Sequence, residues 1–163
     1  MDFAYNDEQK EIIKVVRDLV EKEIVPYAAE MDETGKLHEG LLEKLAAQGL
    51  LGVAIPEEFG GAGLDAITIA AIYEELGKGC AGVATTVAAN ALASYPVIIA
   101  GNDDQKKRYF DIINDDNLAA FALTEPGTGS DAGSVSTRAM KTEDGKGYIL
   151  NGTKCFITNG ALA

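Results

Sequence analysis

The 163-residue sequence contains no tryptophan, a single histidine, His38, and only two cysteines, Cys80 and Cys155. One histidine cannot supply a metal cluster, and the cysteines show neither a CxxC pair nor a metal-ligand spacing, so no metal site is predicted. We expect both cysteines to be buried free thiols of a reducing compartment. His38 lies where a helix is expected to begin, and we expect its side chain to be solvated.

Basic residues are also scarce, since 14 lysines and arginines stand against 26 acidic residues and leave a net charge of -12. Nucleic-acid binding requires a basic face against phosphate, so the charge excludes that class of partner. The first residues lack both the basic region and the apolar core of a secretory signal. We therefore expect a cytoplasmic location, or the mitochondrial matrix if the source is eukaryotic and the protein is processed.

Only one stretch, residues 81–101, is long and apolar enough to consider as a membrane span. It carries threonine, asparagine, serine, tyrosine and proline, and this polarity favours a helix buried in protein over one in lipid. No membrane span is therefore predicted. Within this stretch, residues 81–93 are small and apolar on nearly every side, which is typical of a central packed helix.

The sequence up to about residue 116 has helical periodicity and clear helix boundaries. Asn6 and Asn102 each precede a glutamine by three residues, which is a capping-box pattern. Asp65 is placed to cap another helix, and Gly49 is placed to end a short one. We therefore expect this part to form an all-α domain.

The pattern then changes to short β-type runs separated by glycine turns, at Asp144-Gly145 and Asn151-Gly152. So few strands rarely close a stable sheet alone, and we expect the chain to be a fragment. The expected fold class is α+β, with a helical N-terminal domain at 1–116 and an incomplete β-domain at 117–163. The predicted strands are 118–123, 136–141, 148–150 and 153–158.

The most informative stretch runs from Thr124 to Asp131, with the sequence Thr-Glu-Pro-Gly-Thr-Gly-Ser-Asp. Glycines let a ligand come close to the backbone, and successive N–H groups in such a turn form an anion site. Ser130 adds a hydroxyl donor. The loop is therefore expected to hold a phosphate, although it has neither a P-loop nor a GxGxxG sequence. Glu125 is expected to be structural, as a loop carboxylate that accepts hydrogen bonds from backbone amides.

A second motif follows at 151–160, where Asn151-Gly152 is the expected turn and 153–158 the expected strand. On a strand, side chains alternate between faces, so Phe156 and Thr158 are expected to share one face. An aromatic ring and a hydroxyl in this arrangement suit a planar heteroaromatic ligand. The aromatic ring would stack on the face of the ligand, and the hydroxyl would form a hydrogen bond at its edge.

With both motifs in this order, the chain resembles the acyl-CoA dehydrogenase family of flavoproteins. The resemblance rests on 121–131 and 154–160, and also on the upstream stretches 56–61 and 100–106. It implies FAD as cofactor and a reaction that converts a fatty acyl-CoA to its 2,3-enoyl-CoA. It also implies a helical domain, a β-barrel and a C-terminal helical domain, the last of which is absent from this chain.

The resemblance also assigns roles to residues of this sequence. Phe121, Leu123 and Thr124 correspond to contacts with the flavin ring, and Gly129 and Ser130 correspond to contacts with the pyrophosphate. Phe156 corresponds to the aromatic residue that packs on the isoalloxazine, and Thr158 corresponds to the hydroxyl at its reactive nitrogen. The expected cofactor-binding residues are Phe121, Leu123, Thr124, Gly129, Ser130, Phe156, Ile157 and Thr158.

For the substrate, the resemblance places Ser130 near the CoA portion and the small residues Ala84 and Ala88 along the acyl chain. The family's catalytic base is a glutamate of the C-terminal domain, so no catalytic residue is expected within these 163 residues. Electron transfer flavoprotein is the implied electron acceptor, and a homotetramer is the implied assembly of the full-length protein.

Two alternatives remain open from the sequence. One is a flavin-dependent oxidase or monooxygenase on the same fold, which differs in how oxygen reaches the reduced flavin. The other is a non-catalytic helical interaction module that has kept the fold without the cofactor. The presence of both flavin motifs counts against the second alternative, because such a module has no need of them.

Overall fold

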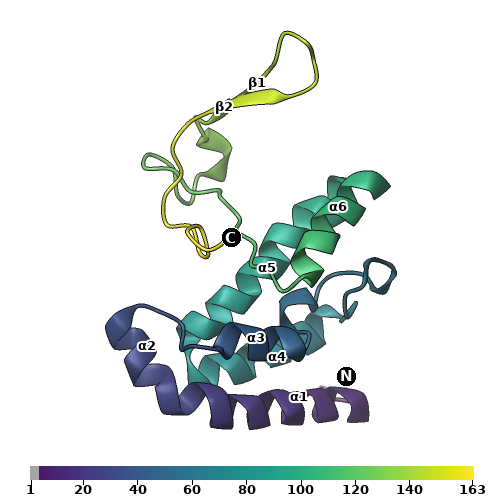
Figure 1. The fold of residues 1–163 in the computed structure, drawn as a ribbon, viewed down its shortest axis with the longest axis vertical. Coiled ribbons are helices and arrows are strands. Elements are labelled where there is room, and N and C mark those ends of the chain that lie inside the picture. The colour runs from purple at the N-terminus through teal and green to yellow at the C-terminus, as the bar shows by residue number, and fades with distance from the viewer. Residues whose placement is uncertain (1–3) are drawn as a thin grey trace.

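The computed structural model describes residues 4–163, with a helical part and a small β-hairpin that stands away from it (Figure 1). Strands β1 (Arg138–Lys141) and β2 (Tyr148–Asn151) pair antiparallel, with Arg138 opposite Asn151. The combination agrees with the expected α+β class. The helices are α1 (Asp7–Leu19), α2 (Ala28–Thr34), α3 (Leu41–Ala47), α4 (Ala66–Gly79), α5 (Ala81–Ala100) and α6 (Asp103–Asn114).

The helix boundaries follow the local signals in the sequence. Asn6 and Asn102 both form complete capping boxes, in which the asparagine side chain accepts from the glutamine N–H and the glutamine side chain accepts in return. Asp65 accepts from two backbone N–H groups at the start of α4. Gly49, which follows the C-cap residue of α3, adopts a φ of 69°, a left-handed conformation that glycine adopts without steric cost.

Short irregular helical turns connect the main helices. A π-helical segment, Val20–Ile24, and a 3₁₀ turn, Val25–Tyr27, join α1 to α2 around Pro26. Proline cannot donate the backbone hydrogen bond of a regular helix, which accounts for the change of helix type there. Further 3₁₀ turns lie at Leu50–Gly52, Glu57–Phe59 and Ala132–Ser134.

The main core lies between the helices, with buried side chains from α1, α3, α4 and the first half of α5. Its most deeply buried aliphatic side chains include Ile24, Leu45, Leu76 and Val87, all fully shielded from solvent. A smaller cluster around Phe110 packs at the other end of α5. Burial of each such side chain contributes roughly 1.5–3 kcal/mol, so this core is the main source of the helical part's stability.

By length and composition α5 could cross a membrane, with a mean hydropathy of 1.5 over its most apolar window, of which 39% is buried within the fold. Its inner face is not purely apolar, because Asn90 and Ser94 are fully buried there. Ser94 donates to the carbonyl of Asn90, and the Asn90 amide bonds three backbone groups outside the helix. The helix therefore carries specific polar contacts that position neighbouring segments.

The expectations for the histidine and the cysteines need correction. The His38 side chain is only 25% exposed, because its ring stacks on Tyr27 at 3.5 Å between centroids. Cys80 and Cys155 are free thiols, as expected, but both are partly exposed rather than buried. Cys80 is partly exposed because it lies in the one-residue link between α4 and α5.

Two of the four predicted strands are wrong. Residues 118–123 and 153–158 form no strand; Cys155 N donates to the carbonyl of Thr124, just beyond the first of these segments. Phe156 has a φ of 57°, a left-handed conformation that breaks the alternation of faces expected for a strand. Phe156 is 94% exposed.

Of the two glycine turns predicted around the β-hairpin, one is present and the other is not. Asp144-Gly145 is a turn, as expected, with Gly145 at a φ of 68°, but Asn151-Gly152 is not. Asn151 is the last residue of β2, and Gly152 lies against Thr137 so closely that a Cβ at position 152 would be 2.2 Å from the threonine hydroxyl. Glycine is therefore required at 152 by close backbone approach and not by a turn.

An ion pair between the half-exposed Arg17 and the buried Glu75 joins α1 to α4 and gives a stability prediction. The Arg17 guanidinium donates two hydrogen bonds to Glu75, at 2.9 and 3.0 Å, and Lys78 donates a third at 2.8 Å. These bonds lower the pKa of Glu75 to about 2 although its side chain is only 6% exposed. The ionised carboxylate is thus strongly favoured in the folded state.

We expect Glu75→Gln to lower the free energy of unfolding by about 2 kcal/mol at pH 7. A lowered pKa gives stability that is present above the unfolded value near 4.5 and is lost as the pH falls toward 2, so the difference from wild type should shrink over that window. Urea unfolding at several pH values measures this. Glu74→Gln is the control, because Glu74 is exposed and bonds only Lys78; an equal loss in the two variants would contradict the prediction.

Candidate functional site

The first motif forms a tight loop that is closed on itself. Glu125 and Thr128 exchange two backbone hydrogen bonds of 3.0 Å across Pro126 and Gly127. The Thr128 hydroxyl then donates to the Ser134 carbonyl at 3.1 Å. These bonds fix the start of the loop, whereas Gly129 and Ser130 beyond it are exposed.

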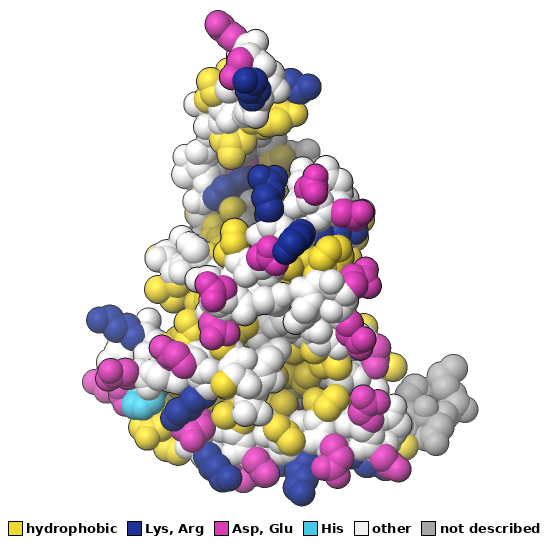
Figure 2. Space-filling view, turned by 45° about the vertical axis from the view of Figure 1, so that its right-hand side comes forward, with side chains coloured by type: hydrophobic (Ala, Val, Ile, Leu, Met, Phe, Trp, Pro, Cys, Tyr) yellow, Lys and Arg dark blue, Asp and Glu magenta, His cyan; other side chains and the backbone are white. Residues whose placement is uncertain are grey.

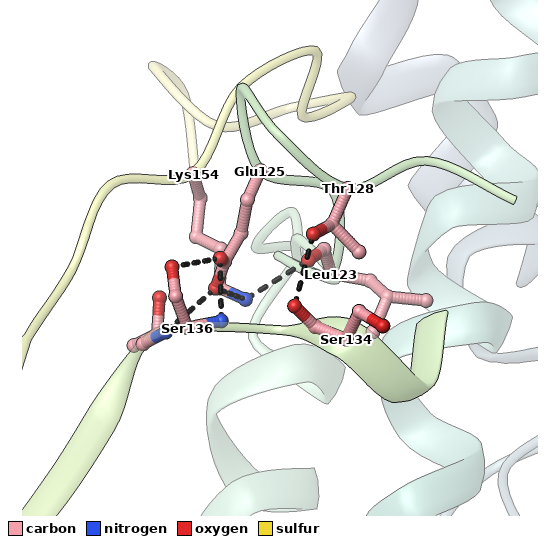
Figure 3. Close-up of polar contacts among 7 residues, drawn as sticks. Leu123, Glu125, Thr128, Ser134, Ser136 and Lys154 are labelled. Atoms are coloured by element: carbon pink, nitrogen blue, oxygen red, sulfur yellow. Dashed lines mark hydrogen bonds and ion pairs between the residues drawn. The ribbon is translucent and has the colours of Figure 1, made fainter. Parts of the chain in front are cut away.

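The Glu125 carboxylate is the centre of this loop, as Figure 3 shows. One of its oxygens accepts from the backbone N–H and the hydroxyl of Ser136, at 2.7 and 2.6 Å. The other accepts from Thr137 N–H and from Lys154 Nζ, both at 2.9 Å. Glu125 is only 4% exposed, so the charge is enclosed and fully bonded.

These bonds determine the protonation state of Glu125. The hydroxyl, Lys154 and backbone donors together hold the pKa of Glu125 far below its usual range. A carboxylate whose two oxygens are engaged by four donors is a poor proton acceptor. The structural role expected for Glu125 is therefore confirmed.

Lys154 joins the two motifs. Besides Glu125, its ammonium group bonds the carbonyl of Leu123 at 2.9 Å (Figure 3). The backbone bond from Cys155 N to Thr124 O lies one residue further along each segment. The two motifs, about thirty residues apart in sequence, are thus fixed side by side.

Two asparagine side chains attach these segments to α5. Asn90 accepts from Ala119 N–H at 2.8 Å and donates to the carbonyls of Asn117 and Leu51 at 3.2 and 3.4 Å. Asn159 donates to the carbonyl of Ala119 and to that of Thr86 in α5, both at 3.0 Å. Amide side chains here provide the pairing that neighbouring strands would provide in a sheet.

The result is a cleft of about 590 Å³ between α5 and the two motif segments. Among the residues that the structure describes, no lysine, arginine, aspartate, glutamate or histidine lines it, and three of its apolar residues, Leu123, Leu92 and Phe156, are exposed by 39%, 51% and 94%. The lining residues are Tyr73, Thr85, Ala88, Ala89, Ala91, Leu92, Tyr95, Phe121, Leu123, Thr124, Phe156, Ile157 and Thr158.

The cleft brings together most of the residues expected to bind cofactor or substrate. Three of those residues are placed elsewhere. Gly129 and Ser130 lie exposed on the first motif's loop. Ala84 lies on the side of α5 that packs on the hydrophobic core, with its methyl group toward Gly77 of α4. The expected residues in the cleft are Phe121, Leu123, Thr124, Phe156, Ile157, Thr158 and Ala88.

Sequence reasoning missed several residues that build or line this site. Lys154 was part of the second motif but received no role, and its distance from Glu125 in sequence hid their pairing. Asn90 is a polar residue in an otherwise apolar helix, which is a signal that could have identified it. Tyr73 enters the cleft from α4 and had no motif around it.

Models of known families match nearly the whole chain. Residues 6–114 match the acyl-CoA dehydrogenase N-terminal domain, and residues 120–163 match the acyl-CoA dehydrogenase middle domain. The first of these alone covers more than half of the chain. The gap between the two matches contains the segment that Asn90 attaches to α5.

Two curated relatives illustrate the similarity. An acyl-CoA dehydrogenase of Bacillus subtilis is 41% identical over 158 residues, which are 96% of this chain and 41% of that protein. A 3-(aryl)acrylate reductase of Clostridium sporogenes is 42% identical over 160 residues, which are 96% of this chain and 42% of that protein. The chain thus spans about two fifths of the length of these relatives.

Solved structures give the same result. The butyryl-CoA dehydrogenase of Megasphaera elsdenii superposes with a TM-score of 0.89 at 38% identity, over 100% of this chain and 44% of that one. An acyl-CoA dehydrogenase of Bacillus anthracis in complex with FAD superposes with a TM-score of 0.86 at 38% identity, over 98% of this chain and 28% of that one. A chain from work on the electron transferring flavoprotein of Acidaminococcus fermentans superposes with a TM-score of 0.91 at 36% identity, over 100% of this chain and 43% of that one. The chain therefore belongs to the acyl-CoA dehydrogenase family, with regions that match the N-terminal and middle domains.

Proposed function

We propose that this chain is the flavin-binding part of an FAD-dependent acyl-CoA dehydrogenase. The observation that carries the proposal is the cleft, where both sequence motifs meet on α5. FAD is the cofactor of the family, and one of the superposed structures is an FAD complex. The substrate proposed is a fatty acyl-CoA, in keeping with the names of the relatives.

The residues in the cleft suit a flavin ring. An uncharged lining accepts a large aromatic ring system without leaving a buried charge unpaired. Phe156 offers a free aromatic face, and the hydroxyls of Thr124 and Thr158 can bond the polar edge of a heterocycle. Exposed apolar side chains at Leu123 and Leu92 would be covered by the ligand, which is favourable.

In this proposal the substrate loses two hydrogens, a proton from the carbon next to the thioester carbonyl and a hydride from the following carbon. FAD, when bound, supplies the acceptor for the hydride. Phe121, Leu123 and Phe156 would orient the ring and exclude water, and Thr158 would donate a hydrogen bond where charge develops. The proton acceptor is proposed to be a glutamate outside these residues, because Glu125 is fully engaged.

The further properties proposed for the complete protein rest on family membership. An electron transfer flavoprotein is the proposed electron acceptor, in line with the Acidaminococcus structure. A homotetramer and a cytoplasmic or mitochondrial-matrix location complete the proposal. Ser130 is proposed to contact the cofactor pyrophosphate and CoA from the exposed loop, together with Gly129.

The experiment that tests the proposal is FAD binding by two forms of the protein. We expect the complete protein to be yellow with about one FAD per chain, whereas residues 1–163 alone should bind FAD weakly, because the cleft is open on the side of Phe156. Flavin absorbance after gel filtration with added FAD measures both. A complete protein that retains no FAD, or that is not reduced by any acyl-CoA, would refute the proposed function.

A further inference from the structure

The peptide unit between Leu123 and Thr124 is held in a specific orientation by Lys154. The Leu123 carbonyl accepts from the Lys154 ammonium at 2.9 Å, and Lys154 itself does not line the cleft, whereas Leu123 and Thr124 do. In a trans peptide the C=O and the following N–H point in opposite directions. No cis peptide occurs among the described residues. The Thr124 N–H therefore points away from the Leu123 carbonyl and Lys154, and the two residues that this peptide joins both line the cleft.

The Thr124 N–H also lacks a partner within residues 4–163, although the Thr124 carbonyl accepts from Cys155 N. A backbone N–H at the wall of a binding cleft is a directional donor for a ligand acceptor, and its usefulness depends on a fixed peptide plane. Here the plane of the Leu123–Thr124 peptide is fixed by the hydrogen bond from Lys154 to the Leu123 carbonyl. Lys154 thus controls a potential ligand contact that it does not itself make.

Lys154 is also held firmly enough for this task. Its side chain is 23% exposed, and its second bond runs to Glu125 at 2.9 Å. Glu125 is in turn fixed by the Ser136 and Thr137 donors. The bond to the Leu123 carbonyl is additional to the ion pair with Glu125, so Lys154 holds the Leu123–Thr124 peptide as well as balancing the charge.

We propose that Lys154 is a positioning residue for the flavin ring, which acts by orienting the Leu123–Thr124 peptide so that the Thr124 N–H donates to an acceptor atom of the ring. This inference rests on the proposed function, because it assumes that the ligand in the cleft is FAD. Compensation of the Glu125 charge would by itself explain a lysine at position 154, and the inference adds a second role to it. The two roles can be separated by experiment.

The test compares Lys154→Met, Lys154→Arg, Glu125→Gln and the double variant Glu125→Gln/Lys154→Met in the complete protein. Lys154→Met leaves the Glu125 carboxylate unpaired and releases the Leu123 carbonyl, whereas the double variant restores charge balance without holding the carbonyl. For Lys154→Met and the double variant, we expect the FAD dissociation constant to rise about tenfold. We also expect the flavin midpoint potential to become more negative, because a donor to the ring favours the electron-rich reduced form.

Thermal stability should behave differently from these two flavin properties. The melting temperature should fall for Lys154→Met and recover in the double variant, because no buried charge is then left without its partner. Lys154→Arg should keep the FAD affinity and the potential near wild type, since a guanidinium can bond both acceptors.

Recovery of FAD affinity and midpoint potential together with melting temperature in the double variant would show that Lys154 only compensates Glu125, and would overturn the inference. Wild-type FAD affinity and potential in Lys154→Met would overturn it as well. Failure of the proposed function looks different, since the wild-type complete protein would then retain no FAD or remain oxidised with acyl-CoA.

Discussion

Replacement of Thr158 by valine in the complete protein should slow the reduction of bound FAD by substrate about 100-fold, with little change in FAD affinity. Thr158 lines the cleft, and its hydroxyl makes no hydrogen bond to residues 4–163. Valine keeps the shape and removes the donor. A hydrogen bond to the reacting part of the ring is worth most as negative charge develops there, so the rate should fall more than the affinity.

Stopped-flow absorbance of the flavin measures the reduction rate, and flavin retention on gel filtration measures the binding. Thr153→Val is the matched control, because Thr153 is an exposed threonine of the same segment that does not line the cleft. An unchanged reduction rate in Thr158→Val would mean that this hydroxyl has no part in the reaction.

The largest effect on stability is expected for Asn90→Leu, with a loss of about 3 kcal/mol or more in the free energy of unfolding. Asn90 is fully buried, and its amide satisfies the carbonyls of Leu51 and Asn117 and the N–H of Ala119. Leucine has a similar volume but leaves all three backbone groups without a partner. Each buried group left unsatisfied costs about 1–3 kcal/mol.

Chemical denaturation of the wild-type and variant chains measures this loss. Thr85→Ala provides the control on the same helix, because the Thr85 hydroxyl is exposed and bonds only the Ala81 carbonyl within α5. We expect that control to change stability by less than about 0.5 kcal/mol. Equal stabilities of Asn90→Leu and wild type would show that water or a shifted backbone replaces the amide.

The helical part was predictable because its signals are local. A capping box such as Asn6 with Gln9 is complete within four residues, so its bonds follow from sequence without knowledge of the rest of the fold. The same holds for Asp65 and for the turn at Asp144-Gly145. Apolar spacing then indicates which side of each helix faces the core.

The segments around the site were predicted less well because their conformation depends on distant partners. Residues 118–123 and 153–158 have strand-like composition, but they are held by the side chains of Asn90, Asn159 and Lys154 instead of by ladder hydrogen bonds. The left-handed backbone at Phe156 has no local signal, since it is not a glycine. The motifs still identified the cleft, because its lining depends on residue type more than on strand geometry.

The attachment of Asn159 to Thr86 has a consequence for biosynthesis, because the two residues are separated by 73 positions. At a translation rate of about 5–20 residues per second, Asn159 leaves the ribosome roughly 4–15 s after Thr86 of α5. During that interval the wall of the cleft that α5 provides stands without the second motif opposite it. The nascent chain thus passes through a stage in which a chaperone has access to the same surface that later lines the cleft.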